Sequence, residues 1–233
     1  MSMICILLHV VYSQKTLYDF TMKDENTIDK LSKVVHFQYS WPEKKGPYTM
    51  FNPDPKYFKM VEQGLELNLY PSDKPHQSDS KTLARTEIGF ETEILLDDIA
   101  YSFSFDHYIS MFPKDEFDYS FAQIFGNGGP NVMLRYRGGN YQLMAGGMKS
   151  NVAGSPNENI EKWVTWKIDF VLATNNGYVR VYRNGSLFLQ LAGNTSGGKS
   201  RNHSTVKHGM YSQGALPSSQ VQSFTRNLIL TSK

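Results

Sequence analysis

Several features that would assign a chain to a functional class at once are scarce or missing in this sequence. Among 233 residues there is a single cysteine, Cys5, which excludes an intrachain disulfide and a cysteine-based zinc site. The lysines and arginines form no long run, and the formal net charge of +2 is too small to indicate a nucleic-acid partner. No glycine-rich phosphate loop follows an expected strand, and the histidines lack metal-ligand spacing. We therefore expect no cofactor, while structural calcium near Asp97 and Asp98 stays open.

Long hydrophobic runs are also missing, so no segment is expected to cross a membrane. The apolar stretch from Met3 to Tyr12 is too short to span a bilayer and ends at a small-residue pattern compatible with signal cleavage. We interpret residues 1–13 as a signal peptide and expect a secreted protein, with residues 14–233 forming a single domain. The alternative is that this stretch is an edge strand of the mature fold.

The chain is instead rich in short aromatic and β-branched segments. Its 40% hydrophobic and 13% aromatic residues provide enough apolar surface for a core, and sandwiches of this length often form one domain. From Leu65 onward these segments recur between clusters of glycine, proline, asparagine and aspartate, which is typical of an all-β sandwich. The expected strands are Thr86 to Leu95, Tyr101 to Ile109, Ser120 to Phe125, Val132 to Tyr136, Thr165 to Val171, Tyr178 to Tyr182, Leu187 to Leu191 and Ser223 to Leu230.

Local patterns refine this expectation. In the segment 101–105 aromatic residues alternate with serines, as a half-buried strand requires. Asn184-Gly185 lies between two expected strands, and both residues tolerate the positive φ of a type I′ hairpin turn. We expect Tyr39 to Pro55 to form a long surface loop and Asp54 to Gly64 to form one short helix.

Four segments together resemble a known family. They are Arg85-Thr86-Glu87-Ile88, Ala122-Gln123-Ile124-Phe125, the Asn184-Gly185 turn, and Lys207-His208-Gly209-Met210-Tyr211-Ser212-Gln213. In this order they resemble the jelly-roll polysaccharide lyases, the group that contains heparin lyase I-like, glucuronan lyase and alginate lyase enzymes. The resemblance covers roughly Thr82 to Gln213. It implies a concanavalin A-like β-jelly-roll sandwich of two antiparallel sheets, and β-elimination from a uronate polymer.

The residues of the last segment suit that chemistry. Alternation along a strand places Lys207, Gly209, Tyr211 and Gln213 on a single face, where the glycine would leave room for a polymer. A lyase removes the C5 proton of a uronate, which is acidic only when the adjacent carboxylate is neutralised. Donors next to that carboxylate are therefore required.

We expect four catalytic residues on this basis. Gln123 and Arg85 would neutralise the uronate carboxylate, one with an amide and one with a guanidinium fork. Tyr211 would act as base and then as acid, with Lys207 and Arg85 supplying the positive charge that a phenol of reference pKa about 10 needs near neutrality.

One position departs from the resemblance. The family usually carries histidine after Gln-x, whereas this chain has Phe125. The departure implies a mechanism that uses tyrosine alone, a substitute such as His76 or His107, or loss of catalysis. His107 is a candidate for reaching the groove, with an ordinary surface histidine as the other interpretation.

Substrate contacts are expected from Arg135, Tyr141, Gln213, Glu87 and His107. Each has a structural alternative. Arg85 and Glu87 share a strand face and could simply form an ion pair. Arg135, Arg137 and Lys149 could line a subsite for sulfate or carboxylate, or could be solvated charges of an edge strand. Tyr141 could stack on a sugar or pack in the core.

The sequence therefore predicts a monomeric lyase acting on an acidic polysaccharide, with glucuronan, alginate and heparin-like polymers all open. A non-catalytic lectin-like module of the same fold is the main alternative. A glycoside hydrolase needs two carboxylates flanking the scissile bond, and the nearest stretch, Glu116-Phe117-Asp118, lacks the acid that would complete such a cluster.

Overall fold

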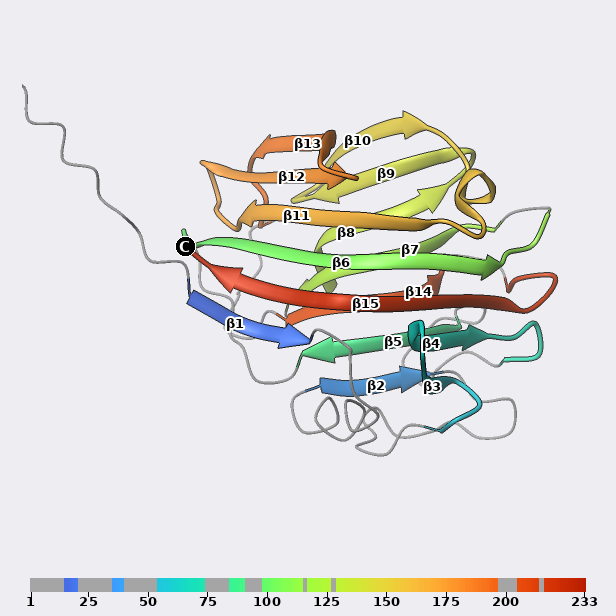
Figure 1. Cartoon of the computed structure of the whole chain (residues 1–233). Coiled ribbons are helices and arrows are strands. Elements are labelled where there is room, and N and C mark those ends of the chain that lie inside the picture. The colour runs from blue at the N-terminus through green and yellow to red at the C-terminus, as the bar shows by residue number, and fades with distance from the viewer. Residues whose placement is uncertain are drawn as a thin grey trace, which may run out of the picture.

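Two antiparallel β-sheets stacked face to face form the protein (Figure 1). The computed structural model describes residues 15–20, 35–39, 54–73, 84–90, 98–114, 117–126, 129–196, 205–213 and 216–233. Residues 1–13, most of the expected loop at 39–55, and His76 lie outside these ranges. Within the described ranges there is no α-helix, and no helix long and apolar enough to cross a membrane.

The eight-stranded sheet has the order β13-β12-β11-β6-β15-β4-β3, with β1 also paired to β15. Its strands are β1 (Lys15–Phe20), β3 (Phe58–Val61), β4 (Gly64–Leu69), β6 (Ala100–Met111), β11 (Trp163–Val171), β12 (Gly177–Arg183), β13 (Ser186–Gly193) and β15 (Val221–Ser232).

The seven-stranded sheet has the order β10-β9-β8-β7-β14-β5-β2. Its strands are β2 (Val35–Tyr39), β5 (Arg85–Phe90), β7 (Tyr119–Gly126), β8 (Gly129–Arg137), β9 (Asn140–Ala145), β10 (Met148–Ala153) and β14 (Thr205–Ser212). A 3₁₀ turn, Pro156–Asn159, joins β10 to β11 across the two sheets.

Period-two alternation explains the core between the sheets. On β6 the inward side chains include Phe103 and Phe105, while on β7 and β11 they include Phe121 and Trp166, all at most 3% exposed. Phe121 and Trp166 meet across the gap with ring centroids 5.1 Å apart. The predicted all-β sandwich is confirmed, and every expected strand overlaps an observed one.

The predicted Asn184-Gly185 hairpin is also confirmed, between β12 and β13. Asn184 and Gly185 have φ of 49° and 81°, the left-handed values that a type I′ turn demands. The amide N–H of Thr165, at the neighbouring strand β11, donates to the Asn184 side-chain oxygen at 2.9 Å, which fixes the turn against the sheet.

The predicted helix over Asp54 to Gly64 is wrong. The carbonyl oxygen of Asp54 accepts the N–H groups of Tyr57 and Phe58 at 2.9 and 3.0 Å, which closes one turn that does not continue. The chain then forms the β3-β4 hairpin, in which Phe58 pairs with Leu67 and both are buried. The helix-start signal at Asp54 was real, but the following residues alternate with a strand period.

Strand β14 lies between β5 and β7 and is held very close to β5 at Gly209. Gly209 has φ of 142°, and a Cβ there would overlap the backbone of Thr86 and lie 2.7 Å from the Glu87 Cα. We expected this glycine to open space for a polymer. The space where its side chain would be is instead filled by the backbone of β5, so the glycine permits the close pairing of β14 with β5.

The core also holds two histidines. His107 on β6 and His208 on β14 are 5% and 0% exposed, with ring centroids 5.7 Å apart, and His208 packs on Phe105 at 4.1 Å. Burial lowers the pKa of His107 to about 4. Burial, followed by the charge of His107, lowers the pKa of His208 well below its ordinary value. Both side chains are therefore neutral in the folded protein near neutrality.

Replacing Gly209 by alanine is expected to destabilise the fold by clearly more than the ~1–2 kcal/mol that a left-handed non-glycine residue costs, because the methyl group collides with β5. Gly139→Ala is the matched control: Gly139 also has positive φ, 75°, but nothing lies within 4 Å of its added Cβ. Urea unfolding measures both variants. Equal losses of unfolding free energy would contradict the account of Gly209.

Stability is expected to fall as the pH drops from about 6.5, the pKa of an unfolded histidine, toward about 4. In that window the unfolded chain binds protons that the buried histidines do not, so each contributes a slope of about 1.4 kcal/mol per pH unit. Above about 6.5 this effect is absent. Urea unfolding of the parent and of His107→Gln across this range isolates one histidine, since carboxylates titrate alike in both. Parallel pH profiles would refute the assignment.

Candidate active site on the seven-stranded sheet

The face of the seven-stranded sheet turned away from the core carries most of the residues expected at the site. We call it the polar face. Its side chains come from β5, β7, β8, β9 and β14: Arg85, Glu87, Ser120, Gln123, Arg135, Gln142, Lys207 and Tyr211. The alternate residues of the same strands, such as Ile88, Leu134 and Met210, are buried in the core.

Strand register arranges the polar face in rows. Tyr211 pairs with Arg85 on one side and with Ser120 on the other, and Ser120 pairs with Arg135. This row therefore runs Arg85, Tyr211, Ser120, Arg135 across four strands. In a second row Lys207 pairs with Gly89 on one side and with Gln123 on the other. Side chains in one row are close neighbours across the strands.

Glu87 lies at the base of this arrangement. It is 1% exposed, and its carboxylate accepts a hydrogen bond from Gln123 Nε2 at 2.6 Å and faces Arg85 Nη1 at 3.5 Å. The predicted Arg85–Glu87 ion pair is thus present. A buried carboxylate needs such donors, so Glu87 fixes the orientation of the two side chains that were expected to neutralise a uronate.

Two contacts between a cation and an aromatic ring complete the part of the site around Glu87. The Arg85 guanidinium lies over the Tyr211 ring, 4.4 Å from its centroid, and Tyr211 is half-buried. The Lys207 ammonium lies 4.1 Å from the centroid of the Phe125 ring, at the position where the resemblance implies histidine. Positive charge is therefore placed next to the phenol and next to Gln123.

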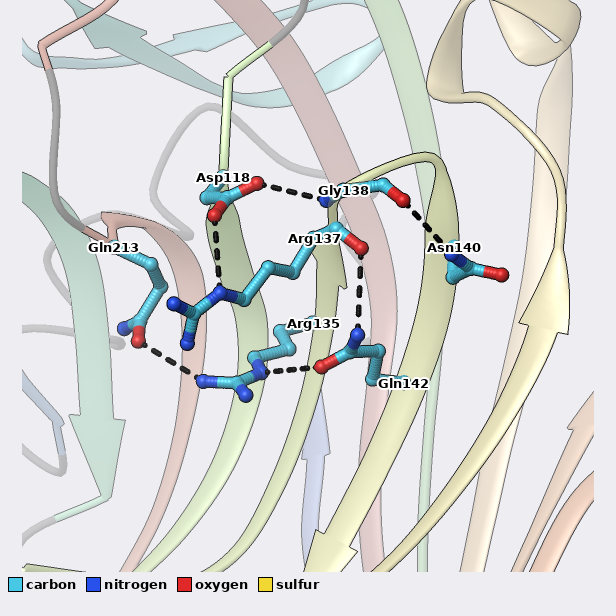
Figure 2. A network of polar contacts seen from close by, with 7 residues as sticks. All are labelled: Asp118, Arg135, Arg137, Gly138, Asn140, Gln142 and Gln213. Atoms are coloured by element: carbon cyan, nitrogen blue, oxygen red, sulfur yellow. Dashed lines mark hydrogen bonds and ion pairs between the residues drawn. The ribbon is translucent and has the colours of Figure 1, made fainter.

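Arg135 is the centre of the second part of the site (Figure 2). Its Nε donates to Gln142 Oε1 at 3.1 Å and its Nη1 to Gln213 Oε1 at 3.4 Å. Figure 2 shows the guanidinium held between these two amides, while Gln142 in turn donates to the carbonyl of Arg137 at 3.3 Å. Burial lowers the pKa of Arg135 from its ordinary value, with the charge of Arg137 adding to the effect and Asp118 opposing it.

The neighbouring Arg137 has a different role. It is exposed and pairs with Asp118 at 3.1 Å, and Asp118 also accepts the N–H of Gly138 at 2.9 Å. These contacts hold the β8-β9 turn and the start of β7. Both carboxylate oxygens of Asp118 therefore make structural contacts, and nothing at this position supports the glycoside-hydrolase alternative. Glu116 lies outside the described residues.

The structure brings seven of the nine expected site residues onto or beside the polar face: Tyr211, Gln123, Arg85, Lys207, Glu87, Arg135 and Gln213. His107 and Tyr141 are placed elsewhere. Both point into the core, at 5% and 2% exposure, and the Tyr141 hydroxyl accepts a hydrogen bond from Asn159 Nδ2 at 2.9 Å. The expectations that His107 reaches the groove and that Tyr141 stacks on a sugar are corrected.

Sequence reasoning missed Ser120 and Gln142. Ser120 is fully buried and stands between Tyr211 and Arg135 in the row, and Gln142 holds Arg135. Neither residue belongs to a recognisable motif. Strand register is the signal that would have found them, because each pairs directly with a residue already selected.

No group of three or more histidine, cysteine, aspartate or glutamate side chains that could hold a metal ion occurs in the described part of the chain. Asp98 is exposed with φ of 60°, and Asp97 lies outside the described ranges. Structural calcium near these two residues stays a prediction.

No protein-family model matches the sequence, and no curated protein matches it at a significant level. Solved structures do match. An alginate lyase of polysaccharide lyase family 7 superposes with a TM-score of 0.61 at 17% identity, covering 85% of this chain and 94% of the other. The alginate lyase from Corynebacterium sp. gives 0.63 at 14%, covering 92% and 99%, and one from Pseudomonas aeruginosa gives 0.63 at 14%, covering 87% and 99%. The chain therefore has the β-jelly-roll fold of these proteins.

Proposed function

We propose that the protein is a polysaccharide lyase that cleaves a uronate polymer by β-elimination on the polar face. The observation that carries the proposal is that Tyr211 and Arg85 share one row of the sheet face and Lys207 and Gln123 share another, with Glu87 in the row between them. A lyase needs a base next to donors for a carboxylate, and these are the side chains that meet there.

In the proposed reaction Gln123 and Arg85 bind the carboxylate of the reacting uronate and stabilise the charge that develops when C5 loses its proton. The Tyr211 phenolate, stabilised by the guanidinium 4.4 Å from its ring, takes that proton. The electron pair of the C5–H bond forms the C4–C5 double bond, and the C4–O bond to the leaving sugar breaks. Tyr211 then returns its proton to the leaving oxygen.

Glu87 acts as a positioning residue in this scheme. Its carboxylate occupies one donor of Gln123 and one of Arg85, so each presents its remaining N–H groups in a fixed direction. A fixed donor needs no reorganisation when charge develops, which is the main source of electrostatic catalysis.

Alginate is the first polymer to test, because the three superposed structures are described as alginate lyases. Glucuronan and heparin-like polymers are the other candidates, since they present the same uronate carboxylate. The proposal includes secretion, because polymers of this kind are found outside cells.

A lectin-like module of the same fold is the second candidate, and Phe125 is the observation that favours it. A phenyl ring neither transfers a proton nor binds a carboxylate. The Lys207 ammonium lies over that ring, however, so a cation lies beside the position where the resemblance implies an imidazole. We propose that Lys207 supplies the second positive charge near the uronate carboxylate.

Tyr211→Phe is expected to lower kcat by at least about a hundredfold, the usual contribution of a positioned acid or base. Ultraviolet absorbance of the unsaturated uronate product is the readout, with alginate, glucuronan and heparin supplied separately. Tyr178→Phe on β12, in the other sheet, is the control and should retain full activity. If Tyr211→Phe turns over within a few-fold of the parent, the phenol is not the base. If the parent yields no product from any polymer yet binds one, the lectin-like function is correct.

Phe125→Leu is expected to lower kcat/KM about threefold to tenfold, because it removes a cation–ring contact of ~0.5–2 kcal/mol that holds Lys207. Phe125→Tyr keeps an aromatic face and should stay close to the parent. Initial rates on the best polymer measure both. If the leucine variant matches the parent and Lys207→Met does too, Lys207 has no part in the reaction.

A further inference from the structure

Arg135 is a buried cation that has no carboxylate partner among the residues that the structure describes. It is 7% exposed, and its hydrogen-bond acceptors are two neutral amide oxygens, those of Gln142 and Gln213. In the described part of the chain, no carboxylate lies within ion-pair distance of it. The cost of burying a charge is usually offset by an opposite charge, so the arrangement is incomplete without an anion.

The nearby acid does not fill this role. Asp118 is committed to Arg137 at 3.1 Å and to the N–H of Gly138 at 2.9 Å, as Figure 2 shows. Burial lowers the pKa of Arg135, and the charge of Arg137 lowers it further while Asp118 opposes the shift. Two guanidinium groups on neighbouring positions of β8 would attract an arriving anion.

Ser120 adds an unsatisfied donor at the same place. It is 0% exposed, and its Oγ has no hydrogen-bond partner among the described residues. Register places it directly between Tyr211 and Arg135 in the row. Buried hydroxyl groups are normally hydrogen-bonded. A hydroxyl without a partner, next to a guanidinium that has no carboxylate among the described residues, therefore indicates a ligand position.

We propose that Arg135, with Ser120 beside it, binds the carboxylate of a second uronate residue of the polymer, next to the one that Tyr211 attacks. The inference rests on the proposed function and names a subsite of that same face. Arg85, which binds the first carboxylate in the proposed reaction, and Arg135 are three strands apart, roughly 14 Å between backbones. Arg85 is held at Glu87 on β5 and Arg135 at Gln142 on β9, so the two guanidinium groups do not meet and Arg135 holds a different sugar.

The geometry favours a carboxylate over a sugar hydroxyl. Gln142 and Gln213 fix the plane of the guanidinium through Nε and one N–H of Nη1. The second N–H of Nη1 and those of Nη2 are then left to donate side by side in a set direction. A planar fork recognises planar anions, and charge-assisted hydrogen bonds are the strong ones.

The test measures binding of an alginate-type oligouronate to the Tyr211→Phe protein by calorimetry, so that no turnover interferes. Adding Arg135→Gln is expected to weaken binding by about tenfold to a hundredfold, the size of one charged hydrogen bond. Adding Arg180→Gln instead removes an exposed charge of the other sheet and should change the affinity less than about twofold. Arg135→Lys, which keeps the charge and loses the fork, should give an intermediate loss.

A carboxyl-reduced oligomer distinguishes charge recognition from packing. It is expected to bind equally well with arginine or glutamine at position 135, because the interacting carboxylate is gone. Thermal unfolding confirms that each variant is folded, and if Arg135→Gln is not, Arg135→Lys decides by the same comparison. Affinities for the acidic oligomer that match those of the Arg180→Gln control would overturn the inference.

The outcomes separate this inference from the proposed function. If the parent releases unsaturated product but position 135 has no effect on binding, the lyase proposal stands and the subsite is wrong. If the parent binds the oligomer through Arg135 yet releases no product, the subsite stands and the lyase proposal is wrong.

Discussion

The site depends on the register of β14 against its two neighbours. Gly209 lets β14 approach β5 so closely that Tyr211 pairs with Arg85, while the same strand pairs Lys207 with Gln123 on β7. A slip of one residue would turn every one of these side chains into the core. Close backbone pairing at a single glycine therefore determines which side chains meet.

Charge on the polar face is distributed unevenly, as the proposed binding of an acidic polymer requires. At one end the buried Glu87 occupies and orients Gln123 and Arg85. At the other end Arg135 has only amide oxygens as acceptors. The first end has donors held in place for a developing charge, and the second has a buried positive charge with no carboxylate at ion-pair distance among the described residues. Together they define a direction along which a uronate chain would lie.

The strand pattern and the motif spacing were sufficient to predict the sandwich, the Asn184-Gly185 turn and the shared face of Lys207 and Tyr211, because all three depend on local alternation. His107 was misplaced for a reason visible in the sequence: the two-residue rhythm of Phe103 and Phe105 continues through it into the core. Ser120 required knowledge of which strands pair, which no local pattern contains. The Asp54 turn looked like a helix start because a single turn and a helix begin with the same hydrogen bonds.

The most direct test of this account is a crystal structure of the Tyr211→Phe protein with a bound oligouronate. The account predicts that the oligomer crosses β5, β14, β7 and β8, with one carboxylate within hydrogen-bond distance of Gln123 and Arg85 and another at Arg135. An oligomer bound to the eight-stranded sheet, or lying on the polar face with its carboxylates directed away from these residues, would contradict it.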